Sequence, residues 1–306
     1  MSTSGPDWRE LHLLVAGDGA ESCADALLAA GALAVTFTDA GDNPILEPPP
    51  GTTPLWEQVC ITGLFAGATD PDSAWLALAA ELAPAPLPTG RWSELGERPW
   101  AELWQAHFRP RHCGGRLWIC PSWCEPPDPA AINLRLDPGL AFGTGEHPTT
   151  ALCLEWLAGQ PLAGARVLDY GCGSGILAIA SCLLGAALAS AVDIDPQALA
   201  ATRANARHNA IADSRLLVGE PEALTGEQEA PTDAGHDVIL ANILANPLLE
   251  LAPRIAALAA PGARLCLSGI LAEQTAAVAA AYRAWFDLDP PVVRDSWARL
   301  TGIRRR

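Results

Sequence analysis

Residues 167–175 read VLDYGCGSG, a short apolar segment that runs into an acid and three closely spaced glycines. The apolar residues predict the end of a buried parallel strand, and residues 176–184 (ILAIASCLL) predict the helix that follows. Glycine has no Cβ, so the backbone can turn sharply here and a ligand can approach it closely. This strand–turn–helix unit indicates a pocket for a nucleoside cofactor. A glycine-rich turn that binds no ligand is the alternative.

The spacing of the glycines separates two classes of cofactor. A dinucleotide-binding turn, Gly-x-Gly-x-x-Gly, would place its third glycine where Ile176 stands. Here Gly171, Gly173 and Gly175 come at every second residue, and Asp169 precedes them. This spacing resembles the first motif of class I S-adenosylmethionine (AdoMet) methyltransferases and argues against a dehydrogenase.

A second acidic position follows the next strand, which we expect at residues 189–192. Asp193 stands at the tip of that strand, where a carboxylate can accept hydrogen bonds from both ribose hydroxyls of an adenosine. Asp195 directly precedes Pro196, a residue suited to the first helical position, so Asp195 is expected to cap the next helix. A purely structural role for Asp193 is the alternative.

The composition indicates a large acidic protein. With 306 residues the chain exceeds one average domain, so we expect two. The net charge of −16 argues against a nucleic-acid partner, because a phosphate backbone requires Lys and Arg contacts, and it favours basic partners. Residues 1–9 do not form a signal peptide, and we expect no membrane-spanning segment. We therefore expect a soluble cytoplasmic monomer that binds neither nucleic acid nor membrane.

The nine cysteines are scattered and odd in number, which fits free thiols in a reducing compartment. His112-Cys113 and Cys120-x3-Cys124 raise the alternative of zinc, but their spacing is irregular. We expect no metal site.

The first 95 residues predict a small α+β domain. Strands are expected at 8–15, 33–38, 58–64 and 91–95, and helices at 20–30 and 72–82. The order βαββαβ is that of a ferredoxin-like domain. Residues 96–110 are expected to form a linker with a connecting helix over 98–108.

Residues 111–306 predict an α/β domain with a doubly wound, Rossmann-like sheet. Strands at 117–120 and 132–136 come first, and a helix over 148–157 follows. The remaining strands are expected at 165–168, 188–192, 215–218, 237–241, 263–268, 285–289 and 297–303, the last two as a closing reversed hairpin.

Residues 137–150 (DPGLAFGTGEHPTT) predict a loop that closes over the ligand and then starts a helix. Its candidate cofactor contacts are Phe142, Gly143, Thr144, Thr149 and Thr150. Phe142 supplies an aromatic cover, and the glycines allow a tight turn. Pro148 suits the first helical position, so the free N–H groups at Thr149 and Thr150 favour a carboxylate such as that of AdoMet. His147 is expected to cap or pack, with a catalytic role as the alternative.

Residues 238–248 (VILANILANPL) place a polar side chain at the end of another buried strand. In an open α/β sheet this edge is where a substrate meets the cofactor. The side-chain oxygen of Asn242 can accept a hydrogen bond from a neutral amine and aim its lone pair at the cofactor's methyl group. Asn242 is therefore the candidate catalytic residue and a further cofactor contact. A turn that merely closes the strand is the alternative.

Several stretches of the chain together resemble the PrmA family, which methylates ribosomal protein L11. They are DPGLAFGTG-x-HPTT, VLDYGCGSGILAIA, DIDPQAL, NILA-x-PL and SGIL at 268–271. The resemblance covers nearly the whole chain, although Glu146 and Asn246 stand where the family would have Thr or His, and Gly. It implies AdoMet contacts at Thr150, Gly171, Asp193 and Asn242. It also implies that a small N-terminal domain recognises L11, and that lysine side chains and an N-terminal amine are methylated.

The mechanism that we expect is direct in-line transfer of the methyl group to a deprotonated amine, with neither a metal nor a covalent intermediate. A lysine near pKa 10.4 must first lose its proton. The sequence indicates no single general base. An AdoMet-dependent enzyme for RNA or for a small-molecule amine, and a non-catalytic AdoMet-binding module, are the alternatives.

Overall fold

The computed structural model describes residues 8–41, 45, 52–95, 108–137, 145–222 and 235–306. The chain divides into two compact units, Met1–Gln105 and Ala106–Arg306. The helix expected over 98–108 lies almost entirely outside the described residues.

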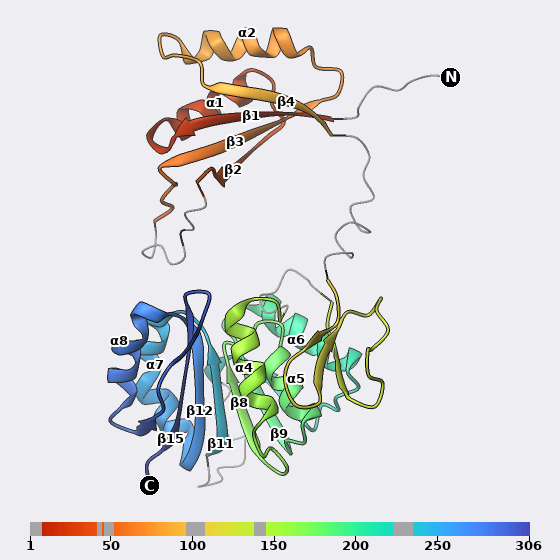
Figure 1. The fold of residues 1–306 in the computed structure, drawn as a ribbon, viewed down its shortest axis with the longest axis vertical. Helices are drawn as coiled ribbons and strands as arrows, with labels where there is room; N and C mark the ends of the chain where they lie inside the picture. Colours follow the sequence, from red (N-terminus) through yellow and green to blue (C-terminus); the bar gives the residue numbers. More distant parts are fainter. Residues whose placement is uncertain (1–7, 42–44, 46–51, 96–107, 138–144, 223–234) are drawn as a thin grey trace. The chain divides into compact units, whose positions relative to one another are not determined.

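The first unit is a four-stranded antiparallel sheet with two helices (Figure 1). Its elements are β1 (Trp8–Ala16), a 3-10 turn (Gly17–Gly19), α1 (Ala20–Ala29), β2 (Ala34–Asp39), β3 (Gln58–Ala66), α2 (Pro71–Leu82) and β4 (Thr89–Leu95). The strand order is β2-β3-β1-β4, and each neighbouring pair is antiparallel. The predicted βαββαβ order and ferredoxin-like arrangement are confirmed.

Alternation of apolar and polar residues explains why these strands form a one-sided sheet. Leu11 and Leu13 of β1 are buried, whereas His12 between them lies on the opposite face, with ring nitrogens 3.0 and 2.8 Å from the hydroxyls of Thr62 and Ser93. The buried face packs against both helices in one apolar core. At the start of α2, Asp70 accepts a 3.0 Å hydrogen bond from the backbone N–H of Ser73.

The second unit begins with a small sheet of order β5-β6-β7. Its strands are β5 (Arg111–His112), β6 (Leu117–Cys120) and β7 (Ile132–Arg135). The two longer strands match the prediction and run parallel. The two-residue strand β5 was not predicted, because so short a segment has no periodicity to detect.

The large sheet carries the remaining elements. These are α4 (Pro148–Ala158), β8 (Arg166–Tyr170), α5 (Ile176–Leu183), β9 (Leu188–Val192), α6 (Pro196–His208), β10 (Leu216–Gly219), β11 (His236–Asn242), α7 (Ala245–Leu258), β12 (Ala259–Leu271), a 3-10 turn (Ala272–Gln274), α8 (Thr275–Tyr282), β13 (Phe286–Leu288), β14 (Val292–Arg294) and β15 (Trp297–Arg304). The strand order is β10-β9-β8-β11-β12-β15-β13, and β14 also pairs with β15. The first five strands are parallel, and β15 is antiparallel to its neighbours.

The doubly wound sheet is thus confirmed, with one addition at its end. The predicted reversed strands β13 and β15 pair, but residues 292–294 form a further strand that makes a tight hairpin with β15. Two proline residues at 290 and 291 concealed this strand from pattern analysis, because proline disfavours a ladder.

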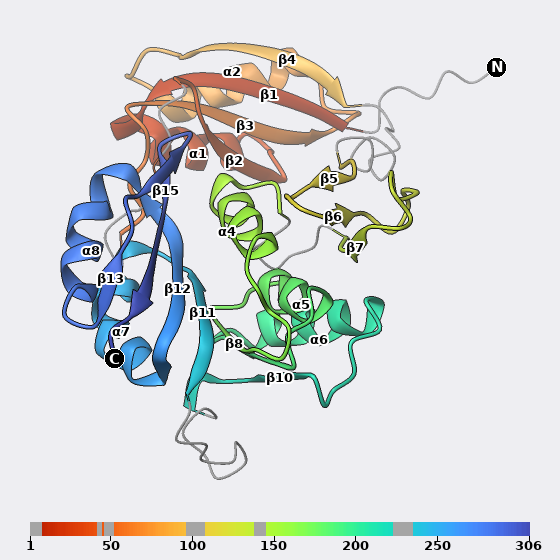
Figure 2. The ribbon, with the colours of Figure 1, turned by 60° about the horizontal axis from the view of Figure 1, so that its bottom comes forward.

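Helices cover both faces of this sheet (Figure 2). One apolar core contains residues of α4, α5 and α6, and the other contains residues of α7 and α8. Val167 and Leu168 of β8 belong to opposite cores and are both completely buried. Burial on both faces explains why the central strands are continuous apolar runs. Within the described residues, no helix is long and apolar enough to cross a membrane.

Candidate cofactor and acceptor site

The glycine turn after β8 has a backbone that only glycine adopts readily. Gly171, Gly173 and Gly175 have φ values of +78°, +54° and +77°. A Cβ on Gly171 would collide with the side chain of Ile243, which lies directly after β11. The N–H of Gly171 donates to the carbonyl of Val192 over 2.8 Å, so the turn is tied to the end of β9. The turn therefore lies against the ends of both neighbouring strands.

Asp193, directly after β9, accepts hydrogen bonds from two backbone N–H groups. Its Oδ2 accepts a 2.9 Å hydrogen bond from the N–H of Gly173, and its Oδ1 accepts a 3.0 Å bond from the N–H of Asp195. A carboxylate has about four acceptor positions, so ribose hydroxyls can still donate to both oxygens. Asp195 caps α6 through a 2.8 Å bond from the N–H of Gln197, which confirms its predicted capping role.

Asp169 lies beneath the glycine turn and is only 1 % exposed. Its Oδ2 accepts a 3.0 Å bond from the N–H of Ala178 in α5, while Oδ1 has no hydrogen-bond partner among the described residues. The pKa of this carboxyl is raised to about 7, because burial raises it more than the hydrogen bond from the Ala178 N–H lowers it, and the nearby Asp193 adds a smaller increase. A buried acceptor with no partner is costly, so its position beside the turn fits a polar or cationic ligand group.

Asn242 ends β11 and contacts the start of α4. Its Nδ2 donates a 3.2 Å hydrogen bond to Oγ1 of Thr150, a completely buried side chain. Its Oδ1 is buried and has no partner within the described part of the chain. The sequence put both residues in the site, but it did not predict this contact between positions 92 residues apart.

The start of α4 differs in one respect from the prediction. Pro148 is at the first turn as expected, and His147 is the capping residue. However, the N–H of Thr149 donates to Nδ1 of His147 over 3.4 Å, so one N–H expected to bind a carboxylate has a partner within the protein. Burial lowers the pKa of His147, which favours the neutral, accepting ring that this cap requires.

Phe142, Gly143 and Thr144 lie outside the described residues. At the end of their loop, Gly145 has a φ of +86°. Nη1 of Arg111 donates to the carbonyls of Gly145 and Glu146 over 3.3 and 3.0 Å. Arg111 thereby attaches this segment to the small sheet. Its role was missed, because the contact spans 34 residues and no motif marks it.

Two polar residues of α6 donate hydrogen bonds to backbone carbonyls of the glycine turn. This role was not predicted from the sequence. The hydroxyl of Thr202 donates to the carbonyl of Gly173 over 3.0 Å, and Nδ2 of Asn205 donates to the carbonyl of Ser174 over 2.8 Å. Thr202 is completely buried, so a polar position on the apolar face of the predicted helix was the available signal.

The described residues contain no cluster of three His, Cys, Asp or Glu side chains able to hold a metal. All nine cysteines are free thiols. Burial raises the pKa of Cys113 to about 11, so this thiol is protonated at neutral pH.

The strand order and the glycine turn, with an acid at the end of the second strand, define the class I AdoMet-dependent methyltransferases. Within that class, the chain belongs to the family described as ribosomal protein L11 methyltransferase (PrmA), whose sequence model matches residues 7–305. The resemblance that the motifs indicated is thereby confirmed.

Relatives named ribosomal protein L11 methyltransferase match almost end to end. The protein from Pseudomonas aeruginosa (strain LESB58) is 53% identical over 298 residues, which cover 97% of this chain and 99% of the relative. The protein from Methylococcus capsulatus is 52% identical over 301 residues, with the same coverage. A crystal structure of the ribosomal protein L11 methylase from Lactobacillus delbrueckii subsp. bulgaricus superposes with a TM-score of 0.57 at 32% identity, covering 65% of this chain and 100% of that one.

Proposed function

We propose that this protein transfers methyl groups from AdoMet to lysine side-chain amines and the N-terminal amine of ribosomal protein L11. The observation that carries the proposal is the placement of Asn242. Its Nδ2 is engaged by Thr150, its Oδ1 has no partner among the described residues, and the next residue, Ile243, packs against the glycine turn. An acceptor oxygen thus lies beside the turn that would hold the methyl donor.

The residues present fit AdoMet. Gly171 and Gly173 give the turn its positive-φ backbone, Asp193 provides acceptors for the ribose, and Asp169 provides a buried acceptor. We propose that Thr149 and Thr150, with Phe142, Gly143 and Thr144 in the preceding loop, complete the cofactor contacts. When bound, AdoMet supplies a methyl group on a positively charged sulfur.

The protein's contribution to the reaction is positioning. An amide oxygen is not basic enough to remove a proton from an ammonium group, so the acceptor amine reaches Asn242 after losing its proton to water or on entering the site. Oδ1 of Asn242 then accepts a hydrogen bond from the neutral amine and directs the nitrogen lone pair. Holding the two reactants in this geometry lowers the entropic part of the barrier.

We further propose that residues 1–95 recognise L11 and that residues 111–306 bind AdoMet, with 96–110 as the connection. Residues 1–95 contain 13 acidic and 2 basic side chains, a net charge of −11, whereas the rest of the chain has 22 acidic and 17 basic, a net charge of −5. An acidic surface attracts a basic protein over long range. We also propose that the protein acts as a cytoplasmic monomer without contacting nucleic acid.

The test is to incubate the protein with AdoMet and purified L11 and to map the methyl groups by mass spectrometry. The sequence contains no lysine, so every methyl-lysine detected must come from the substrate. We expect methylation of L11 lysines and of its N-terminal amine. L11 that stays unmodified, while RNA or a small-molecule amine is methylated in parallel reactions, would refute the proposal.

A further inference from the structure

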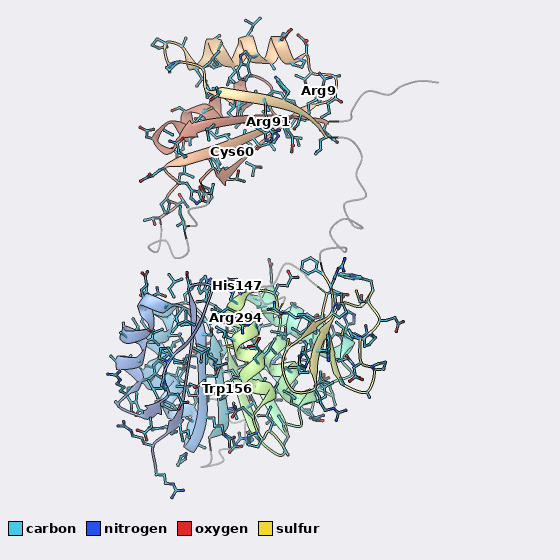
Figure 3. The ribbon with its side chains drawn as sticks, in the orientation of Figure 1. Arg9, Cys60, Arg91, His147, Trp156 and Arg294 are labelled. Carbon is cyan, nitrogen blue, oxygen red and sulfur yellow. The ribbon has the colours of Figure 1, made fainter. Side chains whose placement is uncertain are left out.

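The hairpin of β14 and β15 contacts helix α4, whose first turn carries Thr150. Arg294 of β14 forms two parallel hydrogen bonds with Glu155 of α4, over 2.9 and 2.8 Å between the guanidinium nitrogens and the two carboxylate oxygens. Figure 3 shows Arg294 beside α4, the helix that carries Trp156 and that His147 caps. A two-point arginine–carboxylate pair fixes direction as well as distance, so it restrains how α4 is oriented.

Two more residues of the hairpin contact the same helix. The ring of Trp297 meets the ring of His147 edge-on, with centroids 4.8 Å apart and planes at 71°. Nη1 of Arg299 donates to the carbonyl of Leu152 over 2.7 Å. The hairpin therefore contacts α4 at its cap, in its middle and near its end.

The register of the hairpin explains why these contacts occur together. Arg294 and Trp297 are directly opposite each other in the ladder, and opposed residues project from the same face of a sheet. The turn between them consists of Asp295 and Ser296, both with positive φ, as a two-residue hairpin of this kind requires. One tight turn thus presents both side chains to α4.

Thr150 connects this helix to the reacting centre. The capping residue His147 contacts Trp297, and three residues later Oγ1 of Thr150 accepts the hydrogen bond from Asn242. That bond is 3.2 Å long, at the upper end of the usual range, so a displacement of the start of α4 away from β11 would weaken it and loosen the Asn242 amide.

We propose that Arg294 and Trp297 are positioning residues for methyl transfer, which hold the start of α4 so that Thr150 orients the Asn242 amide. This inference rests on the proposed function only for its effect on turnover. Neither residue touches the reacting atoms, and both act through α4.

The first measurement needs no substrate. The side-chain amide signal of Asn242 is recorded by NMR in the full-length protein with ¹⁵N-labelled asparagine, and is assigned by its loss in Asn242→Asp. We expect Arg294→Gln and Trp297→Leu to shift this signal. The matched control is Arg305→Gln, which removes an ion pair of the same 2.8 Å length, with Asp287, away from α4. An unchanged signal in both test variants, or an equal shift in the control, would overturn the proposal.

The second measurement is a double-mutant cycle on kcat for methylation of L11. We expect Arg294→Gln to lower kcat about fivefold in the wild-type background and less than twofold in the Thr150→Val background. The second effect is smaller because Thr150→Val already removes the hydrogen bond through which Arg294 would orient Asn242. The paired change Glu155→Arg with Arg294→Glu should recover most of the loss. Additive effects in the cycle would show that Arg294 does not act through Thr150. A wild-type protein inactive on L11 would instead count against the proposed function, and the NMR result would still decide the inference.

Discussion

The two units of the molecule bury their strands in different ways. In β1, burial alternates, so that Leu11 and Leu13 are covered while His12 lies on the other face. In β11, residues 238–241 are all completely buried. A one-sided sheet leaves a broad face for a partner, whereas a sheet between two layers of helices offers only its strand ends. The polar side chains Asp193 and Asn242 come at such strand ends, directly after β9 and as the last residue of β11.

The two units also differ in net charge. The first 95 residues hold −11 of the total −16. A broad, acidic, one-sided unit suits long-range attraction of a basic protein, while chemistry requires the fixed geometry of the second unit. Point substitutions in the second unit and removal of the first test whether recognition and chemistry are separated in this way.

Asn242→Ala should have the largest effect and should act on turnover. Loss of the oxygen that orients the amine should lower kcat on the order of 10²-fold, and AdoMet affinity should fall much less. Steady-state kinetics and calorimetric titration with AdoMet would measure the two effects. Equal losses in both would make Asn242 a cofactor contact only, and no loss in either would favour the strand-end turn.

Asp193→Ala should act on cofactor binding. Removing the acceptor for the ribose hydroxyls should weaken AdoMet binding by about 2 kcal/mol, roughly 30-fold in Kd. Calorimetric titration measures this effect directly. Asp195→Ala is the matched control, since it removes only a helix cap and should lower the free energy of unfolding by about 1 kcal/mol with AdoMet affinity unchanged. Unchanged affinity in Asp193→Ala would remove that residue from the site.

Removal of residues 1–97 should separate recognition from cofactor binding. A truncated chain that begins at Arg98 should bind AdoMet with near-native affinity but methylate L11 with kcat/KM lower by at least about 10-fold, because long-range attraction is lost. Added salt should lower kcat/KM of the full chain and have little effect on the truncated one. Circular dichroism would establish that the truncated chain folds. Full kcat/KM in a folded truncated chain would show that the small unit serves another purpose.

The sequence predicted the fold well, because both units follow strong local patterns. Alternation marked β1 and β3, and continuous apolar runs ending in Asp169 or Asn242 marked β8 and β11. The short strands β5 and β14 were missed, since β5 has only two residues and two prolines precede β14.

The site was predictable only where a motif lies within one segment. The glycine turn and Asp193 each follow a recognisable strand in consecutive segments, and the structure joins them by one hydrogen bond. By contrast, the Thr150–Asn242 bond and the Arg111 contact to Gly145 join distant segments, and no local pattern encodes them. Such contacts depend on how elements that are distant in the sequence pack together in the folded chain.

The smallest effect that we expect concerns the protonation of Asp169, a buried carboxyl in strand β8 of the second unit. Its pKa is raised to about 7, chiefly by burial, so the carboxyl is mostly neutral below pH 7 in the free protein. A cationic ligand such as AdoMet favours the ionised form, and binding below pH 7 must therefore release a proton. Affinity should consequently rise with pH, by about fourfold between pH 6.5 and pH 8 for a pKa of 7. Calorimetric titration across this range should show the rise in the wild type and a smaller rise in Asp169→Asn, which cannot ionise. The same slope in both proteins would mean that another group, or the ligand itself, causes the pH dependence, and that Asp169 only holds the turn against α5.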